Sequence, residues 1–156
     1  MKLHLIAVGR ARGGPEAAIV SDYLMRFDRT AKPLGMGPAR LLEIDDRKAR
    51  GADEESALVT AAVPEGAALI ALDERGRTLS SPDFAALLAD WRDQGRRDCA
   101  LALGGADGHA PALRDRADLI LSFGKMVWPH MLARAMAAEQ IYRAATILAG
   151  SPYHRG

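Results

Sequence analysis

The sequence predicts an α/β fold in which a mostly parallel sheet carries helices on both of its faces. Five short apolar segments alternate with segments of helical character along the 156 residues, and parallel strands need such crossovers between them. Two of these segments are apolar throughout, which is typical of strands buried on both faces. We find no linker, internal repeat or low-complexity tract, so we expect one domain over residues 1–156.

The first part of the chain supplies two strands and two helices. Leu3–Val8 is a short apolar run that indicates a strand. Pro15–Phe27 has a proline near its first position and apolar residues on one side, which favours a helix. Two prolines and two glycines make Lys32–Pro38 a loop. Leu41–Ile44 is the second expected strand, and Asp53–Val63 is the second expected helix, with its first residue as the cap.

The middle of the chain continues the alternation. Ala67–Leu72 is an apolar run typical of a buried strand. Residues 73–77 are charged or glycine, which predicts a polar turn. Ser81 as N-cap and Pro82 at the first helical position predict a helix that ends near Gln94.

The last part supplies two more strands and two helices. Cys99–Leu103 is a second buried strand, followed directly by two glycines. Pro111–Ala117 is a short helix that leads into the fifth strand, Leu119–Phe123. Pro129 starts the final helix, which we expect to run to about Ala144.

Composition narrows the functional classes. No apolar run reaches the roughly 18 residues that a membrane-spanning helix needs. The single cysteine, Cys99, cannot form an internal disulfide, which favours a reducing compartment such as the cytoplasm. The four histidines lie far apart and no CxxC or HxxxH pair occurs, so we expect no metal site.

Charge is uneven along the chain although the net charge is only +1. Residues 129–156 carry the arginines Arg134, Arg143 and Arg155 and one acid, Glu139, a balance of +2. A basic end on a near-neutral body suits a polyanion such as RNA that docks at one place. The alternative is an ordinary solvated helix face.

The first glycine-rich segment, residues 9–14, has the glycine spacing of a phosphate-binding loop. Pro15 and Glu16 stand where such a loop needs Lys and Ser or Thr. Binding of a nucleoside triphosphate, or of a nucleotide in a flavodoxin-like protein, is therefore not expected. A turn between strand and helix explains these glycines, and Arg10 and Arg12 could face RNA phosphates.

Three strand ends have the composition of a ligand site. Ligands of parallel α/β sheets bind beyond the carboxyl ends of the strands, and those ends are Leu72-Asp73, residues 103–108 and residues 122–128. The glycines of the second end let backbone approach a ligand closely. Backbone groups of the third strand end, residues 122–128, can form hydrogen bonds with the edge of an adenine ring, while its large apolar residues enclose the ring. Alternatively, the glycines form an ordinary turn and the apolar residues pack in the core, with no ligand bound at either place.

The carboxyl tail places Tyr153, His154 and Arg155 in succession. These residue types stack on bases, form hydrogen bonds to base edges and pair with phosphate. The methionine-rich surface of the preceding helix is more typical of a core or a dimer interface.

These pieces, in this order, resemble the RlmH family of bacterial ribosomal RNA pseudouridine N3-methyltransferases, within the SPOUT superfamily. The resemblance covers essentially the whole chain, and its most specific parts are Pro129-His130, Glu139–Ala144 and Tyr153-His154. It implies a carboxyl-terminal trefoil knot, a homodimer and methyl transfer from S-adenosylmethionine to N3 of a pseudouridine in 23S ribosomal RNA. The substrate it implies is the assembled ribosome.

The resemblance also implies the site residues. Those expected at the cofactor are Leu72, Gly105, Phe123, Gly124, Lys125, Met126, Val127 and Trp128. Transfer to the N3 imide requires loss of a proton, for which His154 is the leading candidate and His130 the next. Arg143 and Tyr153, with Arg155, would hold the RNA or stabilise the developing anion. No metal is needed, because the sulfonium already activates the methyl group.

Two other functions compete with this one. A methyltransferase of the same fold that acts on transfer RNA would have a similar pocket, and methylation of purified ribosomes against transfer RNA separates the two. A non-catalytic RNA-binding module would bind no S-adenosylmethionine, which calorimetry tests.

Overall fold

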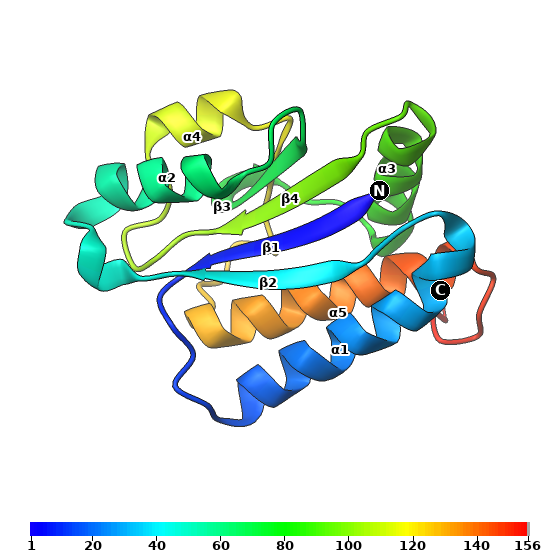
Figure 1. Ribbon diagram of the computed structural model, residues 1–156. Coiled ribbons are helices and arrows are strands. Elements are labelled where there is room, and N and C mark those ends of the chain that lie inside the picture. The colour runs from blue at the N-terminus through cyan, green and yellow to red at the C-terminus, as the bar shows by residue number, and fades with distance from the viewer. Residues whose placement is uncertain (156) are drawn as a thin grey trace.

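Five parallel strands form one sheet in the computed structural model, which describes residues 1–155 (Figure 1). Their order across the sheet is β2-β1-β4-β3-β5, and every neighbouring pair is parallel. The strands are β1 (Lys2–Val8), β2 (Ala39–Ile44), β3 (Ala68–Arg77), β4 (Asp98–Leu103) and β5 (Leu119–Leu121). The predicted fold class and the five predicted strands are confirmed. Gly156, the last residue of the predicted domain, lies outside the described residues.

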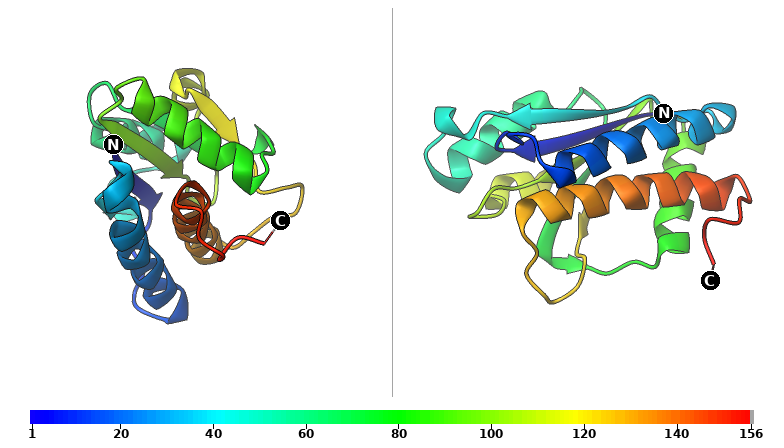
Figure 2. Two further views of the ribbon diagram at one scale, coloured as in Figure 1. Left: turned by 90° about the vertical axis from the view of Figure 1, so that its right-hand side faces the viewer. Right: turned by 90° about the horizontal axis from the view of Figure 1, so that it is seen from below.

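Helices cover both faces of the sheet, as predicted (Figures 1 and 2). One face packs against α1, α3 and α5, and the other against α2 and α4. The helices are α1 (Pro15–Ala31), α2 (Gly51–Ala62), α3 (Ser81–Asp93), α4 (Pro111–Arg116) and α5 (His130–Leu148), with short 3-10 turns η1 (Lys32–Leu34) and η2 (Asp46–Lys48). No helix within residues 1–155 combines the length and the apolar character needed to cross a bilayer.

Side chains of neighbouring residues in the central strands pack into two different hydrophobic clusters, one on each face of the sheet. In β1, Leu5 packs in the cluster that contains Phe27 of α1, whereas Ile6 packs in the cluster that contains Val59 of α2. Leu5 is 1% and Ile6 0% exposed. Since successive side chains of a strand point to opposite faces, a sheet covered on both sides needs apolar residues at every position.

Several helix ends differ from the predicted ones. Ser80, rather than Ser81, caps α3, because its Oγ accepts a hydrogen bond of 3.1 Å from the backbone N–H of Asp83. α2 begins at Gly51, so Asp53 lies in its first turn instead of at the cap. α1 and α5 run about one turn further than predicted. The last turn of α1 buries Ala31 and that of α5 buries Ala145 and Thr146, so contact with the core extends both helices beyond the predicted ends.

The segment after Leu72 is strand where the sequence predicts a turn. β3 continues through residues 73–77, and both Leu72 and Arg77 pair with Leu121 across an irregularity in the register. The polar composition of this segment suggested a turn, but pairing with a strand more than forty residues away decided its conformation. β5 itself ends at Leu121, two residues earlier than predicted.

The end of β3 crosses β5 at very short range. A Cβ atom on Gly76 would lie 2.6 Å from the backbone carbonyl carbon and oxygen of Ile120, closer than van der Waals contact permits. Only glycine lets the two backbones approach in this way. The carboxyl-terminal trefoil knot implied by the family resemblance stays a prediction.

Candidate functional site

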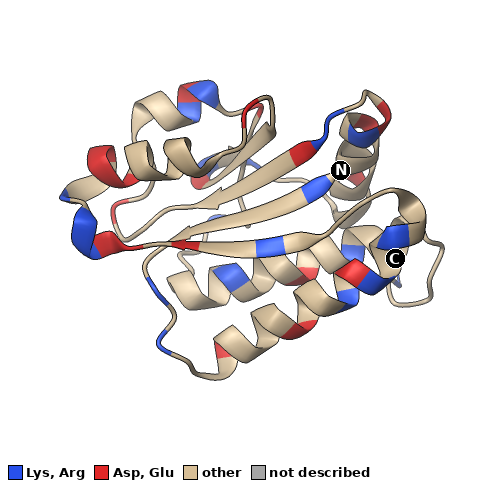
Figure 3. Ribbon diagram, in the orientation of Figure 1, with Lys and Arg blue, Asp and Glu red and all other residues tan. Residues whose placement is uncertain are grey.

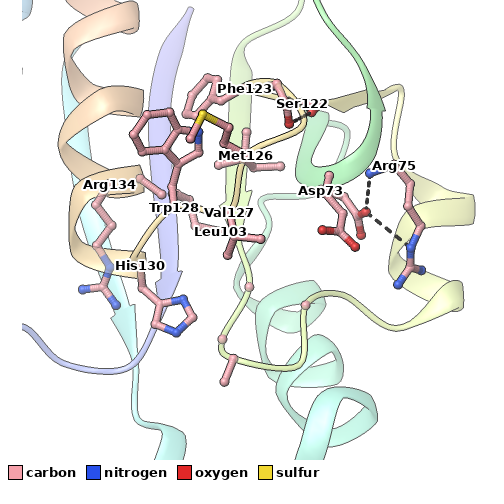
Figure 4. Close-up of a pocket in the computed structure, with 18 of the residues that line it drawn as sticks. Asp73, Arg75, Leu103, Ser122, Phe123, Met126, Val127, Trp128, His130 and Arg134 are labelled. Carbon is pink, nitrogen blue, oxygen red and sulfur yellow. Dashed lines mark hydrogen bonds and ion pairs between the residues drawn. The ribbon is translucent and has the colours of Figure 1, made fainter.

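A cavity of about 270 Å³ opens at the carboxyl ends of β3, β4 and β5, beside the first turn of α5 (Figure 4). We call it the strand-end cleft. It is lined by residues 72–75, 103–108, 122–124, 126–128, 130, 133 and 134. The three strand ends that the sequence singled out therefore meet around one cavity. Of the eight residues expected at a cofactor, all but Lys125 line it.

The glycine loop after β4, residues 104–108, forms the floor of the cleft. A Cβ on Gly104 would lie 2.9 Å from the carbonyl carbon of Gly108, and a Cβ on Gly105 would lie 2.6 Å from Oε2 of Glu55. Neither position has room for a side chain without movement of its neighbour. This floor leaves backbone amides and carbonyls exposed to a ligand, which is the arrangement expected for reading a heterocycle edge.

Buried polar contacts fix the end of the glycine loop. The His109 side chain is buried, and its Nε2–H donates to the carbonyl of Ala102 across 3.1 Å. Burial lowers the pKa of His109, so the imidazole stays neutral. The next backbone N–H, of Ala110, donates to Oγ of Ser56 in α2, 2.8 Å away. The loop is therefore tied both to its own strand and to α2.

Asp73 holds the first strand end in shape. Its side chain is 5% exposed and its Oδ1 accepts from the backbone N–H of Arg75 at 2.9 Å. The guanidinium groups of Arg75 and Arg114 lie 3.8 and 3.6 Å from its carboxylate. The carboxylate thus supports the wall of the cleft, and both its oxygens face cationic or backbone donors.

The third strand end is ordered at its base and exposed at its tip. Oγ of Ser122 both accepts from the backbone N–H of Gly124 and donates to its carbonyl, at 3.1 and 3.0 Å. The apolar residues that were expected to enclose a ring are open to solvent: Met126 is 74%, Val127 85% and Trp128 40% exposed. Figure 4 shows the Trp128 ring beside Met126 above the cleft. Within one chain this loop does not close over a ligand.

A second cavity, of about 610 Å³, adjoins the strand-end cleft on the side of β1 and β2. We call it the side cavity. Its lining comprises residues 8–12, 45–47, 55, 105, 106, 130, 131 and 134. Gly105, Ala106, His130 and Arg134 line both cavities, so the two hollows are continuous neighbours. Sequence patterns do not predict this cavity, because η2, α2 and α5 reach it from distant parts of the chain.

Arg134 is buried between the two cavities. Its side chain is 3% exposed, and its guanidinium donates to the carbonyls of Val8 and Gly9 at 2.6 and 2.8 Å and to Oε1 of Glu43 at 3.0 Å. The same carboxylate oxygen accepts from the backbone N–H of Ala11 at 2.7 Å. Arg134 therefore fixes the loop after β1 to the first turns of α5.

The basic carboxyl end does not present three free cations, and its docking to a polyanion stays a prediction. Arg134 is internal, and Nη2 of Arg143 forms an ion pair of 2.6 Å with Glu139, one turn earlier in α5. Figure 3 shows Lys and Arg distributed over the molecule with acidic residues among them. Of the three arginines counted in that segment, Arg155 alone is exposed. Counting charges along the sequence could not reveal that two of them are paired.

The tail residues gather at the far end of α5. The hydroxyl of Tyr153 donates to Oε1 of Glu139 at 3.0 Å, and Nη1 of Arg143 lies 3.3 Å from Nδ1 of His154. The Tyr153 ring packs under the Arg143 guanidinium, 4.9 Å from its centroid, and edge-on against Tyr142 at 4.8 Å. We call Glu139, Arg143, Tyr153 and His154 the tail cluster. Three of the four predicted catalytic residues lie in it.

The tail cluster does not reach the strand-end cleft of its own chain. His130 lines the cleft, but Arg143 is thirteen residues further along the helix, about 20 Å at 1.5 Å per residue. Arg143, Tyr153 and His154 do not line the cleft within one chain, although Glu139 lines a neighbouring cavity with Phe123 and Gly124, and the expectation that the tail covers the cofactor loops stays a prediction. Burial raises the pKa of Tyr153, and the hydrogen bond to Glu139 adds to this, so the phenol stays protonated at neutral pH.

A family model described as "Predicted SPOUT methyltransferase" matches residues 1–154 of the chain. The chain belongs to the SPOUT methyltransferase family. The family assignment agrees with the resemblance seen in the sequence and with the parallel sheet whose strand-end loops surround one cleft.

Three relatives with curated names align with 155 of the 156 residues of this chain. A protein of Cereibacter sphaeroides is 68% identical over 155 residues, 99% of each chain, and is named "Ribosomal RNA large subunit methyltransferase H". Proteins with the same name from Roseobacter denitrificans and Ruegeria pomeroyi are 63% and 61% identical, again over 99% of each chain.

Solved structures share the fold at low sequence identity. A probable methyltransferase from Bordetella pertussis superposes with a TM-score of 0.52 at 16% identity, covering 92% of this chain and 95% of its own. A probable methylase family protein from Haemophilus influenzae gives a TM-score of 0.51 at 12% identity, covering 99% of this chain and 70% of its own. These likenesses support the SPOUT fold and nothing finer.

Proposed function

We propose that this protein transfers a methyl group from S-adenosylmethionine to N3 of a pseudouridine in 23S ribosomal RNA, on the assembled ribosome in the cytoplasm. The observation that carries the proposal is the 68% identity, over 99% of both chains, to a relative named as a ribosomal RNA large subunit methyltransferase. The strand-end cleft supports it, because its lining comes from the loops expected at the cofactor.

The strand-end cleft fits the cofactor. Leu72, the Gly105 loop and residues 123–128 would hold its adenosine part, mainly through backbone groups. The crowded positions of Gly104 and Gly105 support this, since a side chain at either would collide with Gly108 or Glu55 and displace the loop that lines the cleft. When bound, the cofactor supplies a methyl group already activated by its sulfonium charge. We therefore expect no requirement for a metal ion.

The protein must remove the N3 proton of the target imide and hold the base in line with the methyl group. In the tail cluster Arg143 can only donate, so Nδ1 of His154 accepts and its proton sits on Nε2. His154 can accept a substrate proton only after this contact opens. Arg143, once released, lies next to the anion that forms, where its charge is stabilising.

We further propose a homodimer in which the tail cluster of one chain lies over the cleft of the other. The distance between cluster and cleft within one chain supports this arrangement, because the expected catalytic groups are otherwise separated. The exposed apolar side chains of Met126, Val127, Trp128 and Leu132 beside the cleft also support it, since a partner subunit would remove them from water.

Mapping of methylation on ribosomes from cells with and without the protein tests the proposed function. We expect one pseudouridine of 23S RNA to lose its methyl group in the deletion strain and to regain it when purified protein and S-adenosylmethionine are added. EDTA should not abolish the transfer. Methyl incorporation into transfer RNA instead of ribosomes would favour the alternative substrate. Absence of cofactor binding in calorimetry would favour a non-catalytic module.

Single-turnover kinetics test the assignment of His154. We expect His154→Ala to slow methyl transfer on ribosomes by about 100-fold or more, as is typical when a positioned acid or base is removed, while cofactor affinity stays unchanged. An unaltered single-turnover rate would remove His154 from proton handling and leave His130, which lines the cleft itself, as the next candidate.

A further inference from the structure

A chain of hydrogen bonds connects the start of α3 with the tail cluster. Ser81 is the first residue of α3 but does not cap it, and its Oγ donates instead to Oε1 of Gln140 in α5, 2.7 Å away. Nε2 of Gln140 donates in turn to Oε2 of Glu139 across 2.8 Å. Two residues that lie 59 positions apart in the sequence are thereby joined to the carboxylate at the centre of the tail cluster.

The chemistry of the groups fixes the direction of each hydrogen bond in this chain. An ionised carboxylate such as that of Glu139 only accepts hydrogen bonds, so the amide of Gln140 must turn its nitrogen toward it. The amide oxygen then faces Ser81, whose hydroxyl must donate. If the two ends of the amide were exchanged, its oxygen would face the carboxylate, so the Gln140 side chain has one orientation here.

The two oxygens of Glu139 receive donors from different residues. Oε1 accepts from Nε and Nη2 of Arg143 at 2.9 and 2.6 Å and from the hydroxyl of Tyr153 at 3.0 Å. Within residues 1–155, Oε2 accepts from Gln140 alone. Rotation of the carboxylate would leave this half-buried amide without its acceptor, which is unfavourable. Gln140 therefore holds the carboxylate in a single orientation.

The fixed carboxylate determines where Arg143 points. A guanidinium group is planar and rigid, so the two nitrogens that donate to Glu139 set the direction of the third, Nη1. Nη1 lies 3.3 Å from Nδ1 of His154. Neither nitrogen that is bound to Glu139 takes part in this contact, so Arg143 keeps its direction when His154 turns toward a substrate.

We propose that Ser81 and Gln140 are positioning residues for the proposed methyl transfer. They hold the Glu139 carboxylate, and through it they direct Nη1 of Arg143 at the place where the imide anion forms. This inference rests on the proposed function and assigns a role to two residues that do not line the strand-end cleft. Their effect belongs to the chain that supplies the tail cluster, and it acts on the rate of transfer instead of cofactor binding.

Single-turnover kinetics on ribosomes with the whole purified protein test the inference. We expect Gln140→Met and Ser81→Ala each to slow methyl transfer at saturating ribosome concentration by about 10-fold or more, because a misplaced catalytic group is costly. Ser81→Thr keeps a hydroxyl and should stay within about 3-fold of the wild-type rate. The KM for ribosomes and the calorimetric affinity for S-adenosylmethionine should not change in any of these variants.

Gln94→Met is the matched control, because it makes the same chemical change at an exposed glutamine at the other end of α3. It should leave the rate unchanged. In an Arg143→Met background, Gln140→Met should slow the transfer no further, since its effect passes through Arg143. Fully additive losses would overturn the inference, and so would a wild-type rate in Gln140→Met.

NMR of the guanidinium nitrogens gives a second readout that needs no substrate. The Nε–H signal of Arg143, assigned by its absence from Arg143→Met, should shift in Gln140→Met and stay in place in Gln94→Met. An unmoved signal in Gln140→Met would overturn the positioning role even if the rate falls. If wild-type protein transfers no methyl group, the proposed function fails and the inference with it, whereas an active wild type with unaffected variants overturns the inference alone.

Discussion

At the scale of single residues, Arg134 and Glu55 are opposite cases of buried charge. Arg134 is surrounded by acceptors: two backbone carbonyls and the carboxylate of Glu43. Glu55 has an oxygen with none. The first arrangement stabilises the fold around the site, whereas the second is unfavourable to the stability of the folded chain. The two residues should therefore respond oppositely to removal of charge.

Arg134→Met should lower the free energy of unfolding by about 3 kcal/mol, because it leaves Glu43 and two carbonyls without their donor. Urea denaturation followed by circular dichroism measures the change. Arg26→Met is the control: its partner Asp22 is 44% exposed, so the loss should stay below about 1 kcal/mol. Equal effects of the two substitutions would contradict a bracing role for Arg134.

Glu55→Gln should raise the melting temperature at neutral pH, by about 2–5 °C, because it removes an unsatisfied buried carboxylate. The raised pKa means that wild-type protein gains stability as pH falls through the folded-state pKa. The advantage of the variant should therefore be largest above that pKa and vanish near pH 4. Asp107, Asp46 and His130 face Glu55 from neighbouring elements and shape this dependence. A melting temperature lowered at pH 8 would indicate a structural role instead.

At the scale of elements, the crossing of β3 and β5 decides how the cleft is built. Gly76 lies against the backbone of Ile120, and this contact directs Leu72 and Ser122 to the same cavity. Two strand ends that are about fifty residues apart in sequence thereby become opposite walls of one site.

Gly76→Ala should destabilise the protein by about 2 kcal/mol or more, because a Cβ at 2.6 Å from backbone atoms forces β3 and β5 apart. It should also weaken cofactor binding, since the cleft walls move with these strands. Thermal unfolding and calorimetry measure the two effects. Thr78→Ala, at an exposed position two residues on, should change neither. An unchanged melting temperature for Gly76→Ala would show that β3 and β5 leave room for a side chain at this position, which would contradict the close backbone contact.

At the scale of the whole molecule, the proposed reaction needs two chains. The cleft lies beside the first turn of α5, and Arg143, Tyr153 and His154 do not line it, so one chain does not place these three side chains in its own cleft. A dimer related by two-fold symmetry would form two complete sites, each with a cleft from one chain and a tail from the other.

Mixing two inactive variants tests this arrangement. Gly105→Val introduces a side chain that collides with Oε2 of Glu55 and so displaces the loop that lines the cleft of its chain, and His154→Ala removes the tail histidine. After co-refolding, half of the dimers are mixed and each holds one intact site, so activity should return to about a quarter of wild type. Sedimentation first checks that both variants dimerise. No recovery in the mixture would mean that each chain supplies its own catalytic groups.

The sequence by itself determined the local structure and one half of the site. Apolar runs such as Leu3–Val8 and Cys99–Leu103 predicted the buried strands, since a sheet covered on both faces demands them. The carboxyl ends of parallel strands meet at one edge, which is why three separate loops could be assigned to one ligand. The family resemblance supplied the cofactor and the reaction.

The tertiary structure alone decided where charges and distant segments lie. Arg134 looks like a surface arginine in the sequence and is internal in the fold, and Glu55 meets Gly105 from fifty residues away. It also separated the tail from the cleft. Pairing, burial and crossing depend on contacts between elements far apart along the chain, and no local pattern of residues records which of them will meet.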